Sequence, residues 1–182
     1  MAQKEIASLL IGLLDEFDSA NIKKGIKGFD CGDSFLNRTA KQLIKKGPGT
    51  NLKSYLAVQN GSVAAYCTLR VGQLDGNGLD KRIPEPSKIV PVIVLEQIAV
   101  DTRFQGQGIG SRLLVEVVFE TALMIYKRIG LMGVALWAVP NAISFYSKLG
   151  FINTTVVKPL EGMNLTLMFI PIQALQEAYS SA

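Results

Sequence analysis

Residues 92–114 read VIVLEQIAVDTRFQGQGIGSRLL and contain the two elements that decide the fold. The stretch from Val92 to Val100 is almost entirely apolar, which is typical of a strand covered on both faces. Apolar side chains then recur at helical spacing, so we expect a helix from Gly108 to Arg128. A glycine-rich turn joins the two. Because the first N–H groups of a helix lack internal partners and carry the positive end of its dipole, this turn is predicted to bind phosphate.

Three phosphate-binding patterns can be compared with this turn. A P-loop needs Lys and then Ser or Thr after its second glycine, but Ser111-Arg112 follows Gly110 here. A dinucleotide-binding turn, G-x-G-x-x-G, needs a third glycine where Ser111 stands, and an acidic residue after the next strand, where residues 137–139 read WAV. The third pattern, Q/R-x-x-G-x-G/A, is matched by Gln105, Gly108 and Gly110. A second register that starts at Arg103 matches as well.

A second pattern follows the next predicted strand. The motif A-x-x-F-Y-x-x-x-G-F is matched by Ala142, Phe145, Tyr146, Gly150 and Phe151. With both patterns in this order, the chain resembles the GNAT superfamily of N-acetyltransferases. The resemblance covers roughly residues 92–151. It implies that this stretch is the acetyl-CoA-binding core of a single N-acetyltransferase domain that spans residues 1–182.

The resemblance also implies the architecture and the cofactor site. The expected fold is mixed α/β, with helices on both faces of a mostly antiparallel central sheet and a V-shaped split that holds acetyl-CoA. In the family, the pyrophosphate lies on the glycine-rich turn, and main-chain groups of the preceding strand contact the thioester and the pantetheine arm. Carried over, the cofactor-binding positions are Ile98, Ala99, Val100, Gln105, Gly106, Gln107, Gly108, Ile109, Gly110, Ser111, Asn141 and Phe145. Asn141 departs from the pattern, since many members carry Asn where this chain has Val139.

Two residues are candidates for the chemistry. By resemblance, Tyr146 is the general acid that protonates the departing CoA thiolate, which a phenol with an ordinary pKa of about 10 can do at neutral pH. The alternative is an ordinary core tyrosine. Glu96 stands alone among apolar neighbours and is the candidate for polarising or deprotonating the acceptor amine; it could also face solvent at a sheet edge.

The front of the chain narrows the choice of acetyltransferase. Residues 29–32 read FDCG, and Leu36-Asn37 follows, which resembles the F-x-C-G…L-N signature of GNAT-type toxins of toxin–antitoxin pairs. That resemblance implies acetylation of the α-amine of aminoacyl-tRNA, a ribbon-helix-helix antitoxin as partner, and a homodimer. The alternative for Cys31 is a small thiol buried beneath a turn. Basic residues that would suit tRNA phosphates, or a solvated helix face, cluster in this half: Lys23, Lys24, Lys27, Arg38, Lys41, Lys45, Lys46 and Lys53.

The remaining segments complete a mixed α/β pattern. An amphipathic helix is expected within residues 1–20, and a second helix from about Asp33 to Lys46. The Asn60-Gly61 pair predicts a hairpin between strands at 54–59 and 63–71. A loop is expected at 72–91, and a short helix at 141–149. Further strands are expected at 133–139, 151–157 and 164–170, followed by a polar tail.

Composition sets limits on the chemistry. The chain of 182 residues is 48% apolar and 19% charged, with a net charge of +4, which fits one globular domain. The absence of histidine excludes Ser-His and Cys-His centres within this chain. Two cysteines without neighbouring ligands predict free thiols and no metal site. No apolar run reaches the ~20 residues that span a bilayer, and the start lacks secretory-signal features, so a cytoplasmic location without membrane contact is expected.

Three functions are therefore compatible with the sequence. The first is a toxin-type aminoacyl-tRNA N-acetyltransferase. The second is a housekeeping GNAT enzyme that acts on a small amine, a peptide N-terminus or a lysine. The third is a CoA-binding module without catalysis, against which the presence of Tyr146 argues.

Overall fold

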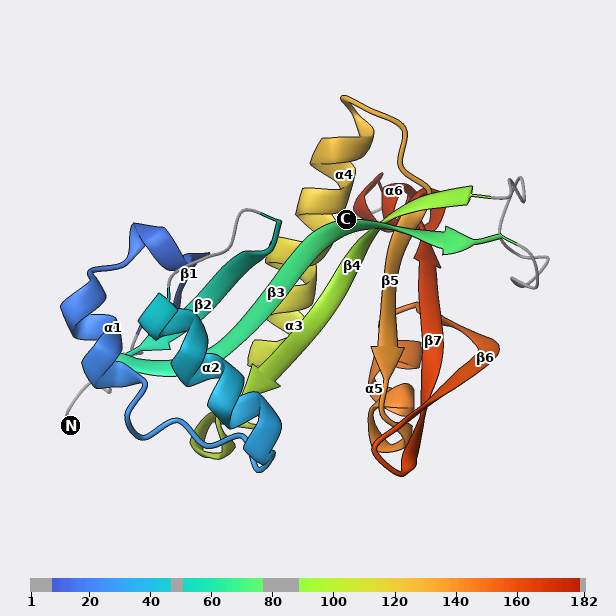
Figure 1. The fold of residues 1–182 in the computed structure, drawn as a ribbon. Helices are drawn as coiled ribbons and strands as arrows, with labels where there is room; N and C mark the ends of the chain where they lie inside the picture. The colour runs from blue at the N-terminus through green and yellow to red at the C-terminus, as the bar shows by residue number, and fades with distance from the viewer. Residues whose placement is uncertain (1–7, 47–50, 77–88, 181–182) are drawn as a thin grey trace, which may run out of the picture. The chain divides into compact units, whose positions relative to one another are not determined.

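The computed structural model describes residues 8–46, 51–76 and 89–180. The chain divides into two compact units, the first formed by Met1–Leu69 with Gln97–Leu114 and the second by Arg70–Glu96 with Val115–Ala182. The strands are β1 Leu10–Leu13, β2 Lys53–Gln59, β3 Ser62–Asp75, β4 Ile89–Val100, β5 Gly133–Ala138, β6 Ile152–Leu160 and β7 Met163–Pro171. They form a seven-stranded sheet in the order β1-β2-β3-β4-β5-β7-β6 (Figure 1). The mixed α/β fold with a mostly antiparallel sheet is thereby confirmed.

The helices connect these strands. The α-helices are α1 Ser19–Gly25, α2 Ser34–Lys46, α3 Ile109–Leu113, α4 Glu120–Tyr126, α5 Ile143–Lys148 and α6 Ile172–Ser180. Single 3₁₀ turns occupy Leu14–Glu16 (η1), Thr102–Phe104 (η2) and Pro140–Ala142 (η4). Between α3 and α4, residues Leu114–Phe119 (η3) form a π-helical segment, so the predicted helix from 108 to 128 is interrupted by wider turns.

In the first unit, β2 and β3 form the predicted hairpin. Asn60 and Gly61 both have positive φ angles, 51° and 71°, as a two-residue type I′ turn requires. The N-terminal part of this unit departs from expectation. Where an amphipathic helix was expected, Leu10–Leu13 pairs antiparallel with β2, from Leu10 opposite Val58 to Leu13 opposite Tyr55. Residues 1–7 of the expected helix lie outside the described residues. The apolar spacing fitted a helix, but the free edge of β2 offers backbone hydrogen bonds to a short apolar run, and that pairing prevails.

Helices α1 and α2 cover the apolar face of this hairpin. Asp18 caps α1 by accepting from the Asn21 N–H at 2.8 Å, and Asp33 caps α2 through the Leu36 N–H at 2.9 Å. Both helices therefore begin at an aspartate whose carboxylate caps the first turn. The buried cluster between helices and strands consists of Leu14, Ile22, Ile26, Phe29, Ala40, Leu56, Val58, Val63, Tyr66 and Ala99.

In the second unit, β5 pairs with β7, β7 pairs with β6, and the first part of β4 pairs in parallel with β5 from Val92/Gly133 to Leu95/Leu136. The pairing of β4 with β5 ends there, while β4 continues to Val100. A buried apolar cluster lies on these strands: Val90, Val92, Val94, Ala135, Leu167 and Phe169.

Two further expectations are corrected in this unit. The predicted polar tail is helix α6, because Ile172 and Leu175 are buried and the helix packs against α4 and β7. The predicted loop at 72–91 is shorter than expected, because β3 extends to Asp75 and β4 begins at Ile89. Residues 77–88 lie outside the described residues. Among the described helices, none combines the length and apolar character needed to cross a bilayer.

Candidate functional site: the glycine-rich turn and the tyrosine helix

The glycine-rich turn lies at the start of α3 in the first unit. Gly106 and Gly108 have φ angles of +73° and +78°, in the left-handed region that glycine adopts at little cost. A Cβ built on either glycine would meet no atom within 4 Å, so open space lies directly in front of both. Residues 105–108 are exposed, whereas Ile109 is buried and anchors the helix.

The start of α3 also lacks the cap that other helices of this unit have. Gly108 occupies the N-cap position without a side-chain hydrogen bond, and the first helical bond runs from the Arg112 N–H to the Gly108 carbonyl at 3.0 Å. The N–H groups at this end are therefore available to an external acceptor. Exposed backbone donors, left-handed glycines and free space in front of them fit a diphosphate group.

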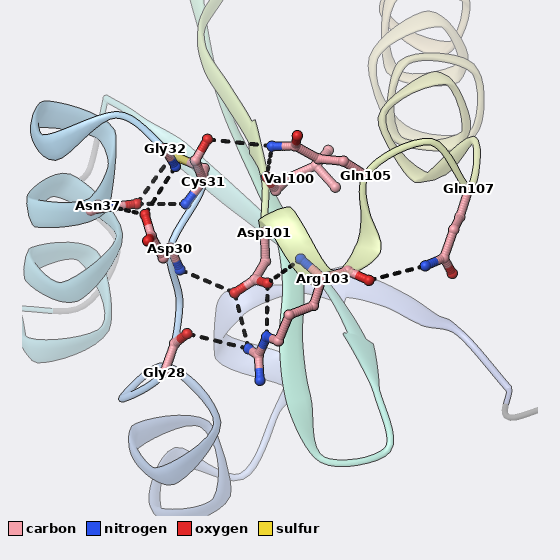
Figure 2. Close-up of polar contacts among 10 residues, drawn as sticks. All are labelled: Gly28, Asp30, Cys31, Gly32, Asn37, Val100, Asp101, Arg103, Gln105 and Gln107. Atoms are coloured by element: carbon pink, nitrogen blue, oxygen red, sulfur yellow. Dashed lines mark hydrogen bonds and ion pairs between the residues drawn. The ribbon is translucent and has the colours of Figure 1, made fainter.

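A buried carboxylate fixes the segment that leads into the turn. Asp101, fully buried at the end of β4, accepts three hydrogen bonds from Arg103, from its N–H at 2.9 Å, from Nε at 2.8 Å and from Nη2 at 2.9 Å. Burial acts to raise the pKa of Asp101, but the hydrogen bonds from Arg103 and Asp30 outweigh it, and the net pKa is lowered. Asp101 is therefore held ionised in the folded protein. Figure 2 shows these contacts.

Two side chains of the turn contact the backbone around them. Gln105 donates from Nε2 to the Val100 carbonyl at 2.9 Å and to the Cys31 carbonyl at 3.3 Å, and Gln107 donates from Nε2 to the Arg103 carbonyl at 3.1 Å (Figure 2). The side-chain amides of Gln105 and Gln107 thus stabilise the conformation of the turn through hydrogen bonds to backbone carbonyls. The remaining predicted positions on this unit are Ile98 and Val100, both half-buried, the buried Ala99, and Gly110 and Ser111 in α3.

The loop at residues 30–32, which no sequence motif assigned to this region, contacts the segment that leads into the turn. Asp30 donates its N–H to Asp101 Oδ2 at 3.0 Å, and the Asp30 carbonyl accepts from the Thr102 N–H at 2.8 Å. The Gly32 N–H donates to Asp30 Oδ1 at 2.9 Å, and this bond, followed by that from Asn37, lowers the pKa of Asp30. The F-x-C-G signature was the available signal, but it did not reveal which segment the loop contacts.

Tyr146 lies in α5 of the second unit and is 7% exposed. Its ring packs edge-on against Phe151, with centroids 5.6 Å apart, and against Phe145 at 5.1 Å. Phe145 itself is partly exposed. The motif aromatics therefore form one cluster that fixes the orientation of the Tyr146 ring. Asn141 is exposed within η4, just before this helix.

Glu96 lies on β4 in the second unit and is not isolated. Its carboxylate accepts a hydrogen bond from Nε of Arg70 on β3, and both side chains are partly exposed, 37% for Glu96 and 41% for Arg70. Although its neighbours in sequence are apolar, Glu96 therefore has a cationic partner in a partly exposed ion pair.

An open hollow of about 390 Å³ lies along α2 in the first unit. Three basic side chains line it, and the complete lining is Ser34, Asn37, Arg38, Lys41, Gln42 and Lys45. The basic residues predicted to cluster in this half are thus partly gathered on one helix face.

Residues 51–153 match the acetyltransferase (GNAT) domain family. This match covers more than half of the chain and contains both motif regions. The chain belongs to the GNAT acetyltransferase family. It is accordingly an acetyl-CoA-dependent N-acetyltransferase, as both motifs predicted.

Relatives of this GNAT protein include toxins. The tRNA-acetylating toxin of Mycobacterium tuberculosis is 29% identical over 163 residues, which are 87% of this chain and 92% of the relative. A structure of AtaT complexed with acetyl-methionyl-tRNAfMet is 27% identical, covers 94% of this chain and 99% of its own, and superposes with a TM-score of 0.77. A crystal structure of a bacterial toxin, 23% identical over 97% of this chain and 98% of its own, has the same fold with a TM-score of 0.85.

Proposed function

We propose that this GNAT protein is a toxin-type enzyme that acetylates the α-amine of aminoacyl-tRNA. The observation that carries the proposal is the similarity, over nearly the whole of both chains, to AtaT in complex with acetyl-methionyl-tRNAfMet. The similarity to a tRNA-acetylating toxin supports the same acceptor class. A shared core domain does not identify a substrate, because one fold serves many functions. Similarity over nearly the full length to proteins that act on one class of substrate is stronger support for that class.

The charge distribution of the first unit supports a polyanionic acceptor. Arg38, Lys41 and Lys45 line one open hollow on α2, and Lys23 and Lys24 lie in the last turn of the neighbouring helix α1. Such side chains neutralise backbone phosphates whatever the base sequence. A polyamine acceptor would instead require an acidic groove, so this face disfavours that alternative.

The residues that would hold acetyl-CoA are those of the turn and of β4. The N–H groups around Gly108 would bind the pyrophosphate, and the main chain of residues 98–100 would bind the pantetheine arm as a strand does. When bound, acetyl-CoA supplies the acetyl group and a thiolate leaving group. Tyr146 would donate the proton that this thiolate needs. Glu96, already paired with Arg70, would act on the acceptor amine as a hydrogen-bond acceptor.

Two partners belong to the proposal. A solved complex of KacTA with DNA is 26% identical to this chain, covers 96% of it, and has a TM-score of 0.74. The expected partner is an antitoxin, of the ribbon-helix-helix type that the F-x-C-G…L-N signature implies. A homodimer located in the cytoplasm, where tRNA is charged, completes the proposed function.

The deciding experiment follows labelled acetyl from acetyl-CoA onto three acceptors: charged total tRNA, deacylated tRNA and polyamines. Label on charged tRNA alone, released by mild base together with the aminoacyl ester, is the expected result. Label on polyamines would instead assign a small-amine acetyltransferase. Tight acetyl-CoA binding without transfer to any acceptor would assign a CoA-binding module.

A further inference from the structure

The side chain of Asn37 makes three hydrogen bonds to residues of the loop at 30–31. From the first turns of α2, its Oδ1 accepts from the Cys31 N–H at 2.9 Å and from the Cys31 thiol at 3.1 Å. Its Nδ2 donates to Asp30 Oδ1 at 2.7 Å. Asn37 therefore holds two consecutive residues of the loop in one conformation, and no aliphatic residue could replace either half of its amide.

The loop that Asn37 holds contacts both ends of the segment that carries the phosphate turn. At the near end, Asp30 binds Asp101 Oδ2 through its N–H and Thr102 through its carbonyl. At the far end, the Cys31 carbonyl accepts from Gln105 Nε2. Figure 2 shows Asn37, Asp30 and Asp101 in one continuous chain of contacts, with Gln105 joined through Cys31. All of these residues belong to the first unit.

The turn depends on these contacts because it has few of its own. Gly106 and Gly108 contribute no side chains, and because glycine lacks a Cβ atom it restricts the backbone less than other residues would. Removing one donor from the fully buried Asp101 leaves part of a buried carboxylate without compensation. A displacement of residues 30–32 would therefore reach the turn through Asp101 and Gln105.

We propose that Asn37 is a positioning residue for the pyrophosphate of acetyl-CoA, acting through Asp30 and Cys31 on Asp101 and Gln105. The inference rests on the proposed function only in assigning the turn to that pyrophosphate. It gives the F-x-C-G…L-N signature a physical role that is separate from the acceptor: the signature sets the shape of the cofactor turn.

The test compares Asn37→Asp with wild type in the full chain. The substitution keeps the size of the side chain but removes the donor to Asp30 and places two carboxylates side by side. We expect the CoA dissociation constant, measured by calorimetry, to rise at least five-fold. Hydrogen exchange at residues 106–110 in the ligand-free protein should accelerate, while exchange in β2 stays unchanged. A residue that served stability alone would accelerate exchange throughout the unit.

Two further variants make the test specific. Asn37→Ala removes the hydrogen bonds with Cys31 as well as the one to Asp30, adds no charge, and should shift both measurements in the same direction. Asn21→Asp makes the same substitution at an exposed position of α1 and should leave CoA affinity within two-fold of wild type. CoA affinity within two-fold of wild type in both Asn37 variants would overturn the proposal, as would equal weakening in Asn21→Asp or uniform acceleration of exchange. Wild-type protein that binds CoA but acetylates no tRNA would refute the proposed acceptor and leave this test intact.

Discussion

At the scale of single residues, Asp101 shows how a buried charge can serve both stability and site geometry. Its folded pKa is lowered because Arg103 and the Asp30 N–H stabilise the carboxylate more than burial destabilises it. A group with a lowered folded pKa contributes stability above its unfolded pKa of about 3.9, and this contribution is lost as the pH falls through the folded value.

Replacing Asp101 with Asn tests this account. We expect the free energy of unfolding at pH 7 to fall by about 2 kcal/mol, since a buried acceptor of charge-assisted hydrogen bonds is weakened. The difference from wild type should stay constant above pH 5 and shrink below about pH 4, where the carboxylate of unfolded wild type is protonated first and that of the folded protein at lower pH. Urea unfolding at several pH values measures it. A difference that is the same at pH 7 and pH 3 would contradict the assignment.

Tyr146 gives the catalytic prediction at this scale. We expect Tyr146→Phe to lower turnover by ~10²–10⁴, the usual contribution of a general acid, with acetyl-CoA affinity near wild type. The phenyl ring preserves the packing against Phe145 and Phe151, so the variant should fold normally. Steady-state kinetics and calorimetry measure both quantities. Unchanged turnover would exclude Tyr146 as the acid.

Gly108 gives a prediction about binding. We expect Gly108→Glu to abolish acetyl-CoA binding, because a carboxylate would stand where the phosphates are expected. The left-handed φ of +78° adds backbone strain, so thermal unfolding must first show that the variant is folded. Gly130→Glu adds the same charge at an exposed glycine outside the turn, where a Cβ would meet no atom within 4 Å. This control should therefore fold and bind acetyl-CoA normally. Normal affinity in folded Gly108→Glu would mean that the phosphates bind elsewhere.

At the scale of elements, local signals predicted much of the fold. The Asn60-Gly61 turn, the helix that begins near Asp33 and the apolar strand before the glycine-rich turn depend on neighbours in sequence, and each is present. β1 and α6 were not predictable in the same way, because the edge of β2 and the surface of β7 decide their conformation. For the same reason the motifs identified the turn, while the bond from Asp30 to Asp101, across 71 positions, could not be read from sequence.

The packing of α1 on the β2–β3 hairpin depends on one glycine. A Cβ on Gly25 would lie 2.6 Å from the Gly61 carbonyl oxygen and 3.3 Å from the Val63 nitrogen, both of which are backbone atoms. We expect Gly25→Ala to lower the free energy of unfolding by about 1–3 kcal/mol, as overpacking does. Gly130→Ala, with open space around its Cβ, is the control and should change stability little. Equal stability of Gly25→Ala and wild type would show that α1 shifts at no cost.

At the scale of the whole molecule, the net charge of +4 says little, whereas its distribution over the first unit is informative. We expect Lys41→Glu/Lys45→Glu to weaken aminoacyl-tRNA binding about ten-fold or more and to reduce the salt dependence of the affinity, with the acetyl-CoA KM unchanged. Lys127→Glu/Arg128→Glu, the same charge change at exposed positions of the second unit, is the control. Equal loss in both double variants would mean that total charge, and not the α2 face, attracts tRNA.

The two units are interleaved along the chain, and this order has a consequence for synthesis on the ribosome. The first unit consists of Met1–Leu69 and Gln97–Leu114, so the hairpin and both of its covering helices emerge before β4 can supply Ala99 and Asp101. At ~5–20 residues per second, the first segment waits on the order of seconds with a strand edge unpaired. Tyr146 follows later still. We therefore expect a nascent chain to bind no cofactor until translation is nearly finished, so that an enzyme directed against charged tRNA would complete its own synthesis before it acts.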